Sequence, residues 1–213
     1  MKPDFKIKNV KLYNVDCRDF MKDIPDNYYE LAIVDPPYGL KSFKNLKENN
    51  NRIQKIFRES ENYNNATPTK KYFDELFRIS RKQIIWGANN FNLPPTEYFL
   101  IWNKQQTVDN FASAEYAWTN YKMPAKVFTY SIHKHNHTTK IHPTQKPIVL
   151  YKWILSKYAK KGDKIFDSHG GSFSSACACL DMGFSFDGCE IDKEYFDNAV
   201  ERLKNNVQDY LDF

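Results

Sequence analysis

The sequence contains no apolar run of about eighteen residues, so it offers no typical membrane-spanning helix. The first residues, Met1 to Lys6, also lack the apolar stretch of a secretory signal peptide. We therefore expect a cytoplasmic protein. With 213 residues, of which 41% are hydrophobic, the chain can form one domain with a substantial core. No internal repeat or interdomain linker divides it, so residues 1–213 are predicted to be a single domain.

Cysteine is scarce, and no C-x-x-C pair typical of structural zinc sites is present. The four cysteines are Cys17, Cys177, Cys179 and Cys189. Most of them fall in segments with core patterning, which favours buried, reduced thiols. His133, His135 and His137 would share one face of a strand, but no acid or thiol accompanies them. The sequence therefore predicts no metal site.

Apolar runs alternate with segments of helical periodicity along most of the chain. Strands are expected at residues 11–16, 31–35, 83–86, 98–102, 114–120, 127–131, 164–167 and 184–191. Helices are expected at 69–80, from the N1 residue Pro147 to a stop at Gly162, at 174–182 and at 194–207. This order predicts an α/β fold with a doubly wound, mostly parallel sheet and helices on both faces. The strands at 114–120 and 127–131 are expected to form an antiparallel edge.

The tetrapeptide Asp35-Pro36-Pro37-Tyr38 directly follows a predicted buried strand. The two prolines stiffen the backbone and cannot donate to a sheet, so the Pro36 carbonyl remains an available acceptor. The Asp35 carboxylate supplies a second acceptor, and Tyr38 offers a ring on which a base can stack. This set suits a weakly nucleophilic amino group on a ring, such as adenine N6. The alternative is an ordinary strand followed by a turn.

A second candidate site, Asp167 to Ser175, lies between a predicted strand and a predicted helix. Open α/β sheets bind ligands at this kind of junction, and Gly170 and Gly171 permit a tight turn there. The loop is neither a phosphate-binding G-x-x-x-x-G-K-[ST] motif nor a clean G-x-G-x-x-G motif. Glu190 follows the next strand, at the offset where an acid reaches ribose hydroxyls. A nucleoside without phosphates fits this layout.

Together these motifs resemble the S-adenosylmethionine-dependent DNA amino-methyltransferases, of the adenine-N6 kind and with Rossmann-like fold. Val15-Asp16-Cys17 resembles that family's Gly-Asp-Cys, and Ile24-Pro25-Asp26-Asn27 resembles its Leu-Pro-Asp turn. The segment from His142 to Pro147 matches the family's His-Pro-Thr-x-Lys-Pro. The catalytic motif precedes the cofactor loop, which is the β-type order. The resemblance covers most of the chain.

The resemblance implies methylation of adenine N6 in DNA by direct displacement, with S-adenosylmethionine as cofactor and no metal, as in restriction–modification. The implied catalytic residues are Asp35, Pro36, Pro37 and Tyr38. The implied cofactor-binding residues are Asp16, Cys17, Asp35, His142, Thr144, Lys146, Asp167, Ser168, His169, Gly170, Gly171, Ser172, Glu190 and Ile191. No Pro-Cys nucleophile for methylation at cytosine C5 is present.

The partner implied by the resemblance is double-stranded DNA with the target adenine flipped out of the duplex. The net charge of +5 permits such a polyanionic partner. A basic loop at residues 41–69 is expected to contact the phosphates, and residues 121–140 are left for target recognition. The expected phosphate contacts are Lys41, Lys44, Lys47, Arg52 and Lys55. With so little room for recognition, a homodimer or a helper subunit is a further expectation.

The chain departs from the family pattern at Ser168-His169, where the family has Pro-Phe, and at Phe173, where it usually has Gly. If position 173 needs a positive φ, phenylalanine is unfavourable there. If the position needs only a close approach, the ring could crowd the cofactor. The open alternatives are a catalytically silent nucleic-acid binder of the same fold, or an amino-methyltransferase acting on cytosine N4, on RNA or on protein glutamine.

Overall fold

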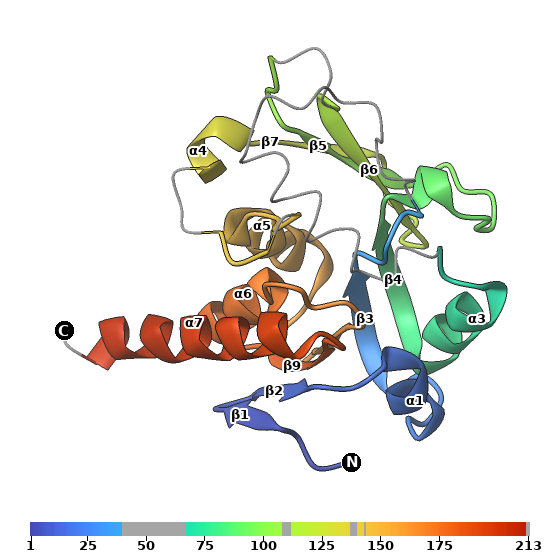
Figure 1. The fold of residues 1–213 in the computed structure, drawn as a ribbon. Helices are drawn as coiled ribbons and strands as arrows, with labels where there is room; N and C mark the ends of the chain where they lie inside the picture. Colours follow the sequence, from blue (N-terminus) through green and yellow to red (C-terminus); the bar gives the residue numbers. More distant parts are fainter. Residues whose placement is uncertain (40–66, 108–111, 137–139, 143, 212–213) are drawn as a thin grey trace, which may run out of the picture.

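The computed structural model describes residues 1–39, 67–107, 112–136, 140–142 and 144–211 (Figure 1). Its strands form one sheet in the order β1-β2-β9-β8-β3-β4-β6-β5-β7. Their bounds are β1 Phe5–Ile7, β2 Val10–Tyr13, β3 Tyr29–Val34, β4 Ser80–Trp86, β5 Phe99–Asn103, β6 Ala114–Thr119, β7 Lys126–Thr129, β8 Lys164–Asp167 and β9 Ser185–Cys189.

The centre of the sheet is parallel. Strands β2, β9, β8, β3 and β4 pair side by side in that order, all in the same direction. β6 runs antiparallel to both β4 and β5, and β1 runs antiparallel to β2. The predicted α/β sheet with an antiparallel edge is therefore confirmed. At the outer end, however, β7 pairs parallel with β5.

Helices cover both faces of the sheet (Figure 1). Their bounds are α1 Cys17–Lys22, α3 Lys70–Ile79, α4 Ile132–Asn136, α5 Ile148–Tyr158, α6 Ser174–Met182 and α7 Lys193–Leu211, with a short 3-10 turn η1 at Ala88–Asn90. One core layer packs α5, α6 and α7 on the sheet. The other packs α1 and α3 on the opposite face. No helix in the described part of the chain is long and apolar enough to cross a membrane.

Most element boundaries lie within a few residues of those expected, and the differences have local causes. The first predicted strand stops at Tyr13, because Asp16 is the N-cap of α1 and its side chain accepts a hydrogen bond from the Arg18 N–H. Pro147 is extended (ψ 139°) and caps α5 rather than lying inside it. That helix ends at Tyr158, and Gly162, with φ +97°, lies in the following turn.

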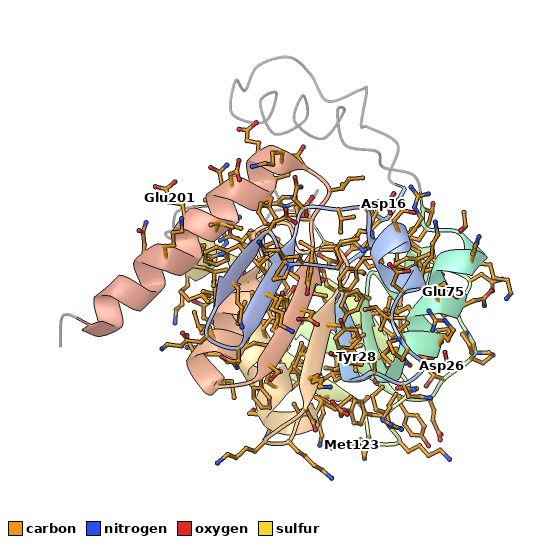
Figure 2. All side chains as sticks on the ribbon, turned by 90° about the horizontal axis from the view of Figure 1, so that it is seen from below. Asp16, Asp26, Tyr28, Glu75, Met123 and Glu201 are labelled. Carbon is orange, nitrogen blue, oxygen red and sulfur yellow. The ribbon has the colours of Figure 1, made fainter. Side chains whose placement is uncertain are left out.

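Arg78 fastens α3 to the turn that leads into β3. Its guanidinium donates to the carbonyls of Ile24 and Met21 and pairs with the carboxylates of Asp26 and Glu75. Figure 2 shows Asp26 and Glu75, both labelled, on the α1–α3 side of the sheet, with α7 on the far side. The turn at Ile24 is thus bound to α3 just before β3 begins.

The parallel pairing brings the ends of five strands to one edge of the sheet. Tyr13 at the end of β2 pairs with Cys189 at the end of β9, and Asp167 at the end of β8 pairs with Gly188. β3 lies between β8 and β4. The segments that follow these strands, which carry both predicted sites, therefore start from neighbouring points of the same edge.

Phe173 caps α6 in the left-handed conformation, with φ +49° and ψ +39°. Its side chain is completely buried and meets Phe186 and Phe196 edge to face. The ring occupies space that two glycines leave open. A Cβ on Gly170 would lie 2.1 Å from a ring carbon, and one on Gly188 would lie 2.6 Å from it. The unfavourable φ of Phe173 is therefore offset by burial of the ring in the core.

This packing predicts that Gly170→Ala and Phe173→Ala are coupled in stability. Phe173→Ala should cost about 3–5 kcal/mol of unfolding free energy because it leaves a cavity. Gly170→Ala should also be costly, because its methyl group meets the ring. In the double variant the ring is absent, so the methyl group at position 170 no longer meets it. The loss of unfolding free energy in the double variant, measured by urea unfolding, should therefore be smaller than the sum of the two single-variant losses by at least about 1 kcal/mol.

Gly162→Ala is the matched control for this cycle. Gly162 has a positive φ of +97°, and apart from its chain neighbours no atom of the described residues lies within 4 Å of the position of its missing Cβ. Its cost should arise from the backbone alone and should add to that of Phe173→Ala. Additive costs for Gly170→Ala and Phe173→Ala would contradict the packing described here.

Candidate active site

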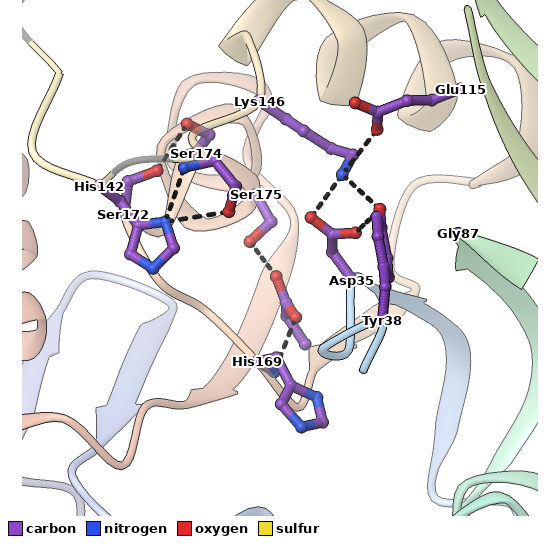
Figure 3. A network of polar contacts seen from close by, with 12 residues as sticks. Asp35, Tyr38, Gly87, Glu115, His142, Lys146, His169, Ser172, Ser174 and Ser175 are labelled. Atoms are coloured by element: carbon purple, nitrogen blue, oxygen red, sulfur yellow. Dashed lines mark hydrogen bonds and ion pairs between the residues drawn. The ribbon is translucent and has the colours of Figure 1, made fainter. Parts of the chain in front are cut away.

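Asp35 and Tyr38 form a hydrogen-bonded pair just beyond the end of β3 (Figure 3). The Tyr38 hydroxyl donates to Asp35 Oδ1 at 2.5 Å. Lys146 Nζ donates to Asp35 Oδ2 and, at 3.2 Å, to the Tyr38 hydroxyl oxygen. Both oxygens of the Asp35 carboxylate are thus held by donors of this chain. The pKa of Tyr38 is raised well above its usual value by burial and by the Asp35 charge, so its hydroxyl stays protonated.

Lys146 lies between two carboxylates. Its side chain is only 4% exposed, and its Nζ is 3.0 Å from Glu115 Oε2 on β6 as well as paired with Asp35. Glu115 also pairs with Lys104. Burial alone would lower the pKa of Lys146, but Asp35 and Glu115 outweigh it and raise the pKa well above its ordinary value. Burial would raise the pKa of Glu115, but Lys146 and Lys104 lower it to about 2. The cluster holds two cations and two anions.

The resemblance placed Lys146 among the cofactor-binding residues, whereas its hydrogen bonds and ion pairs to described residues are with the predicted catalytic motif and β6. Glu115 was not identified from the sequence. A signal was present, since Glu115 shares a strand face with the buried Ala117 and Thr119. An acid on a core-facing position needs a charged partner. That partner, Lys146, lies in the segment just before α5 and not on a strand beside β6, so only the folded structure identifies it.

The Tyr38 ring lies directly against Gly87, which follows β4. A Cβ at Gly87 would lie 2.0 Å from the nearest ring carbon, and Gly87 has a positive φ of +65°. Any other residue would be strained and would displace the ring. Gly87 therefore sets the position of Tyr38 from the neighbouring strand.

The cofactor loop is fixed by buried carboxylates. Asp167, 1% exposed, accepts from Ser175 Oγ at 2.6 Å and from the His169 N–H at 3.1 Å, and burial raises its pKa to about 7. Glu190, 2% exposed, accepts from the Gly171 N–H at 2.7 Å and the Asp192 N–H at 2.9 Å. Burial also raises the pKa of Glu190. Glu190 therefore joins the glycine turn to the end of β9.

His142 and Thr144 lie beside the same turn. A Cβ on Gly171 would be 3.3 Å from the His142 ring, and Thr144 Oγ1 is 3.2 Å from His142 Nδ1. Burial and the Lys146 charge lower the pKa of His142 to about 4, so it is neutral near pH 7. Ser172 Oγ is 3.2 Å from Ser174 Oγ at the start of α6.

Asp16, Cys17, His169 and Ile191 lie at the ends of β2, β8 and β9. Asp16 pairs with Arg18, and Cys17 Sγ is 3.9 Å from His169 Nε2. Ile191 is 63% exposed. All four cysteines of the chain are free and buried, as expected. The predicted catalytic residues and most predicted cofactor residues thus gather at one edge of the sheet.

The two regions predicted to contact DNA, 41–69 and 121–140, are only partly described by the structure or differ from the prediction. Lys41, Lys44, Lys47, Arg52 and Lys55 lie outside the described residues. Within 121–140, His133 belongs to helix α4 rather than to a strand, so the expected shared strand face of three histidines is wrong. His137 lies outside the described residues. Tyr121, at the start of this region, belongs to the core instead, since its hydroxyl donates to the Tyr158 carbonyl at 2.5 Å.

A family model described as DNA methylase, of the N6/N4 type, matches residues 44–201. The chain belongs to this family. Among curated relatives, the type II methyltransferase M.BglII from Bacillus subtilis is 24% identical over 95% of this chain and 71% of its own. DNA methylases of this family use S-adenosylmethionine, and they act on DNA.

Two solved structures share the fold. The cytosine-N4-specific PvuII DNA methyltransferase has a TM-score of 0.63 and is 12% identical, over 96% of this chain and 93% of its own. The complex of M1.HpyAVI with S-adenosylmethionine has a TM-score of 0.54 and is 21% identical, over 91% and 99% of the two chains.

The residues at the sheet edge of this DNA methylase fit S-adenosylmethionine by their chemistry. The ligand is a nucleoside with ribose hydroxyls, an ammonium and a sulfonium, and it has no phosphate. The edge presents the carboxyl groups of Asp16, Asp167 and Glu190 together with the glycine turn. Carboxylates accept hydrogen bonds from hydroxyl and ammonium groups. The buried Glu190 carboxyl beside Gly171 is the group suited to the ribose.

The raised pKa of Asp167 predicts a pH-dependent cost to stability. Its folded-state pKa of about 7 lies above the ordinary 3.8, so the native state binds the proton more tightly. Wild-type stability should fall as pH rises from about 4 to about 7. Asp167→Asn carries no such charge, so its melting temperature relative to wild type should increase from pH 5 to pH 8. A constant difference across this range would contradict the assignment.

The ion cluster predicts different effects for two lysine substitutions. Lys146→Met and Lys104→Met each remove one cation from Glu115, so both should lower stability. Only Lys146→Met also releases Asp35, and we expect it to lower the methylation rate at least about tenfold. Lys104→Met should lower that rate less than about threefold. Equal rate losses in the two variants, measured on folded protein, would show that the Lys146–Asp35 contact is irrelevant to the reaction.

Proposed function

We propose that this DNA methylase transfers a methyl group to the exocyclic N6 of adenine in DNA. The observation that carries the proposal is the Asp35 carboxylate, held by Tyr38 and Lys146 at the end of β3. Within the family that the motifs resemble, aspartate at this position goes with adenine N6 and serine with cytosine N4. The fully ionised Lys146 and the protonated Tyr38 supply only donors to Asp35, so the carboxylate remains the acceptor of the group.

In this proposal Asp35 and the Pro36 carbonyl hold the two N–H bonds of the target amine. Each carboxylate oxygen has two lone pairs, so Asp35 can accept a further hydrogen bond beside those from Tyr38 and Lys146. No described residue donates a hydrogen bond to the Pro36 carbonyl, which leaves it available. Holding both N–H bonds fixes the direction of the nitrogen's remaining lobe, and orientation of this kind supplies a large share of a rate enhancement.

S-adenosylmethionine supplies an electrophilic methyl group when it is bound. Glu190, Asp167 and Asp16 would hold it at the edge of the sheet beside Asp35. Methylation of the amine requires the loss of one N–H proton, and Asp35 is the acceptor that is hydrogen-bonded to it. Lys146 and Tyr38 keep the Asp35 carboxylate in one orientation throughout. No metal and no covalent enzyme intermediate are needed.

The target base must leave the duplex to reach Asp35, because N6 is otherwise paired. The Tyr38 ring, fixed against Gly87, would stack on the flipped base and stabilise it by about 1–3 kcal/mol. We propose that the basic residues of 41–69 contact the phosphates, that 121–140 contributes to target recognition, and that 1–213 acts as one methyltransferase domain. A homodimer or helper subunit would complete the recognition surface.

The test is incubation with DNA and S-adenosylmethionine labelled in the methyl group, followed by nucleoside analysis. We expect label in N6-methyladenine. Asp35→Ala should abolish the labelling while changing the affinity for S-adenosylhomocysteine by less than about twofold, because the acceptor of the target amine is removed and Glu190 is retained. Asp26→Ala, an exposed acid paired with Arg78, is the control and should label DNA at the wild-type rate.

Label in N4-methylcytosine would overturn the base assignment. Binding of S-adenosylhomocysteine without labelling of DNA or RNA would indicate a silent binder. Wild-type labelling by Asp35→Ala would overturn the role of the carboxylate.

A further inference from the structure

Ser168 and His169 stand where the resembled family has Pro-Phe. In this protein they form a series of hydrogen bonds with Tyr72 of α3. Tyr72 Oη is 2.6 Å from Ser168 Oγ, and Ser168 Oγ is 2.8 Å from His169 Nδ1. The Tyr72 and His169 rings also meet edge to face, with centroids 5.3 Å apart. Proline and phenylalanine could form neither hydrogen bond, so the Tyr72 hydroxyl depends on the serine of this chain.

The hydroxyl and imidazole protons of Tyr72, Ser168 and His169 can be placed by requiring that each buried donor has an acceptor. Tyr72 and Ser168 are 3% exposed. Burial raises the pKa of Tyr72 well above its usual value, so its hydroxyl carries a proton that needs an acceptor. Ser168 Oγ is the acceptor within reach among the described residues. An unsatisfied buried donor costs about 1–3 kcal/mol, so Tyr72 donates to Ser168.

Ser168 must then donate its own proton to His169 Nδ1. In the reverse arrangement, with a proton on His169 Nδ1, either the Tyr72 or the Ser168 hydroxyl proton would lack an acceptor in the described structure. Burial lowers the pKa of His169 to about 4, so near pH 7 the ring carries one proton. That proton is therefore on Nε2.

Nε2 lies toward the ends of β2 and β8. It is 3.9 Å from Cys17 Sγ, a weak acceptor, and the Asp16 charge is close enough to act on the His169 ring. His169 is a partly exposed residue, whereas Tyr72 and Ser168 are buried. This edge therefore presents a carboxylate and an N–H donor close together. The amino group and ring nitrogens of adenine form the complementary donor and acceptors.

We propose that Tyr72 and Ser168 fix His169 as the Nε2–H tautomer, and that this N–H donates to a ring nitrogen of the cofactor's adenine. The inference rests on the proposed function for the identity of the cofactor. It gives His169, already among the cofactor-binding residues that the resemblance implies, a hydrogen bond to the base, and it makes Tyr72 a positioning residue that acts through Ser168.

The first experiment measures the tautomer without any ligand. The chain has five histidines, so ¹⁵N–¹H correlation spectra of the imidazole rings are simple, and His169→Phe identifies the signal. We expect His169 to show a protonated Nε2 and a bare Nδ1 at pH 7. In Tyr72→Phe the serine loses its donor, and a mixture of the two tautomers should appear. A protonated Nδ1 in the wild-type protein would overturn the proposal.

The second experiment measures binding of S-adenosylhomocysteine by calorimetry. His169→Phe and Tyr72→Phe should each weaken binding about three- to tenfold, as expected for loss or misdirection of one hydrogen bond. His169→Gln, which keeps an amide N–H near the Nε2 position, should bind more tightly than His169→Phe. Tyr29→Phe removes a buried hydroxyl that donates to Asp187, and as the matched control it should leave the affinity unchanged.

Wild-type affinity in both His169→Phe and Tyr72→Phe would overturn the proposal. Should His169→Phe fail to fold, the Tyr72→Phe spectra and affinity decide the question, because that change removes a single oxygen. If these variants bind as wild type while the wild-type protein still labels N6-methyladenine, the relay is wrong and the proposed function stands. If the wild-type protein binds no S-adenosylhomocysteine, both fail together.

Discussion

The arrangement of the active site depends on one buried ammonium, that of Lys146. It lies between Asp35, which follows the central strand β3, and Glu115, which belongs to the antiparallel strand β6. Removing three buried charges from water is costly, and the cost is offset only while each group keeps its partners. The Asp35 carboxylate is therefore held not only by its own turn but also, through Lys146, by a strand beyond β4. Tyr38 adds a third constraint through Gly87 at the end of β4.

The sheet architecture explains why residues so distant in sequence meet. Parallel strands place their carboxyl ends along one edge, so Asp35, Asp167 and Glu190 come from neighbouring strands. The helices on each face bury the apolar side chains of the strands. The segment that contains Lys146 reaches this edge just before α5. The order of the strands therefore explains why these three acids lie at the same edge of the sheet.

Much of the fold follows from sequence periodicity, and the remainder depends on contacts that are not local. The strand at 164–167 and the helix at 174–182 have the predicted bounds, since their apolar patterns and flanking glycines are unambiguous. The segment around His133 alternates like a strand but forms α4. The DPPY and glycine motifs were visible as sites because their local chemistry is unusual. Glu115 was not, because its partner Lys146 is distant in the sequence and meets it only in the folded structure.

The conformation of Phe173 also depends on contacts that the sequence alone does not reveal. Its positive φ was one of two outcomes that the sequence left open, and the favourable packing depends on Gly170 and Gly188. The ring turns into the core between the sheet and α7, where Phe196 covers it. A residue that departs from the family pattern is therefore compensated by two small neighbours, one from its own turn and one from β9.

The backbone of the glycine turn is held by hydrogen bonds within the protein. Gly170 donates to the Cys189 carbonyl at 2.8 Å, and Gly171 donates to Glu190. These two bonds join the glycine turn to the carboxyl end of β9. In the proposed function, a nucleoside that binds there would meet a preorganised turn, and little of its binding free energy would be lost to ordering the loop.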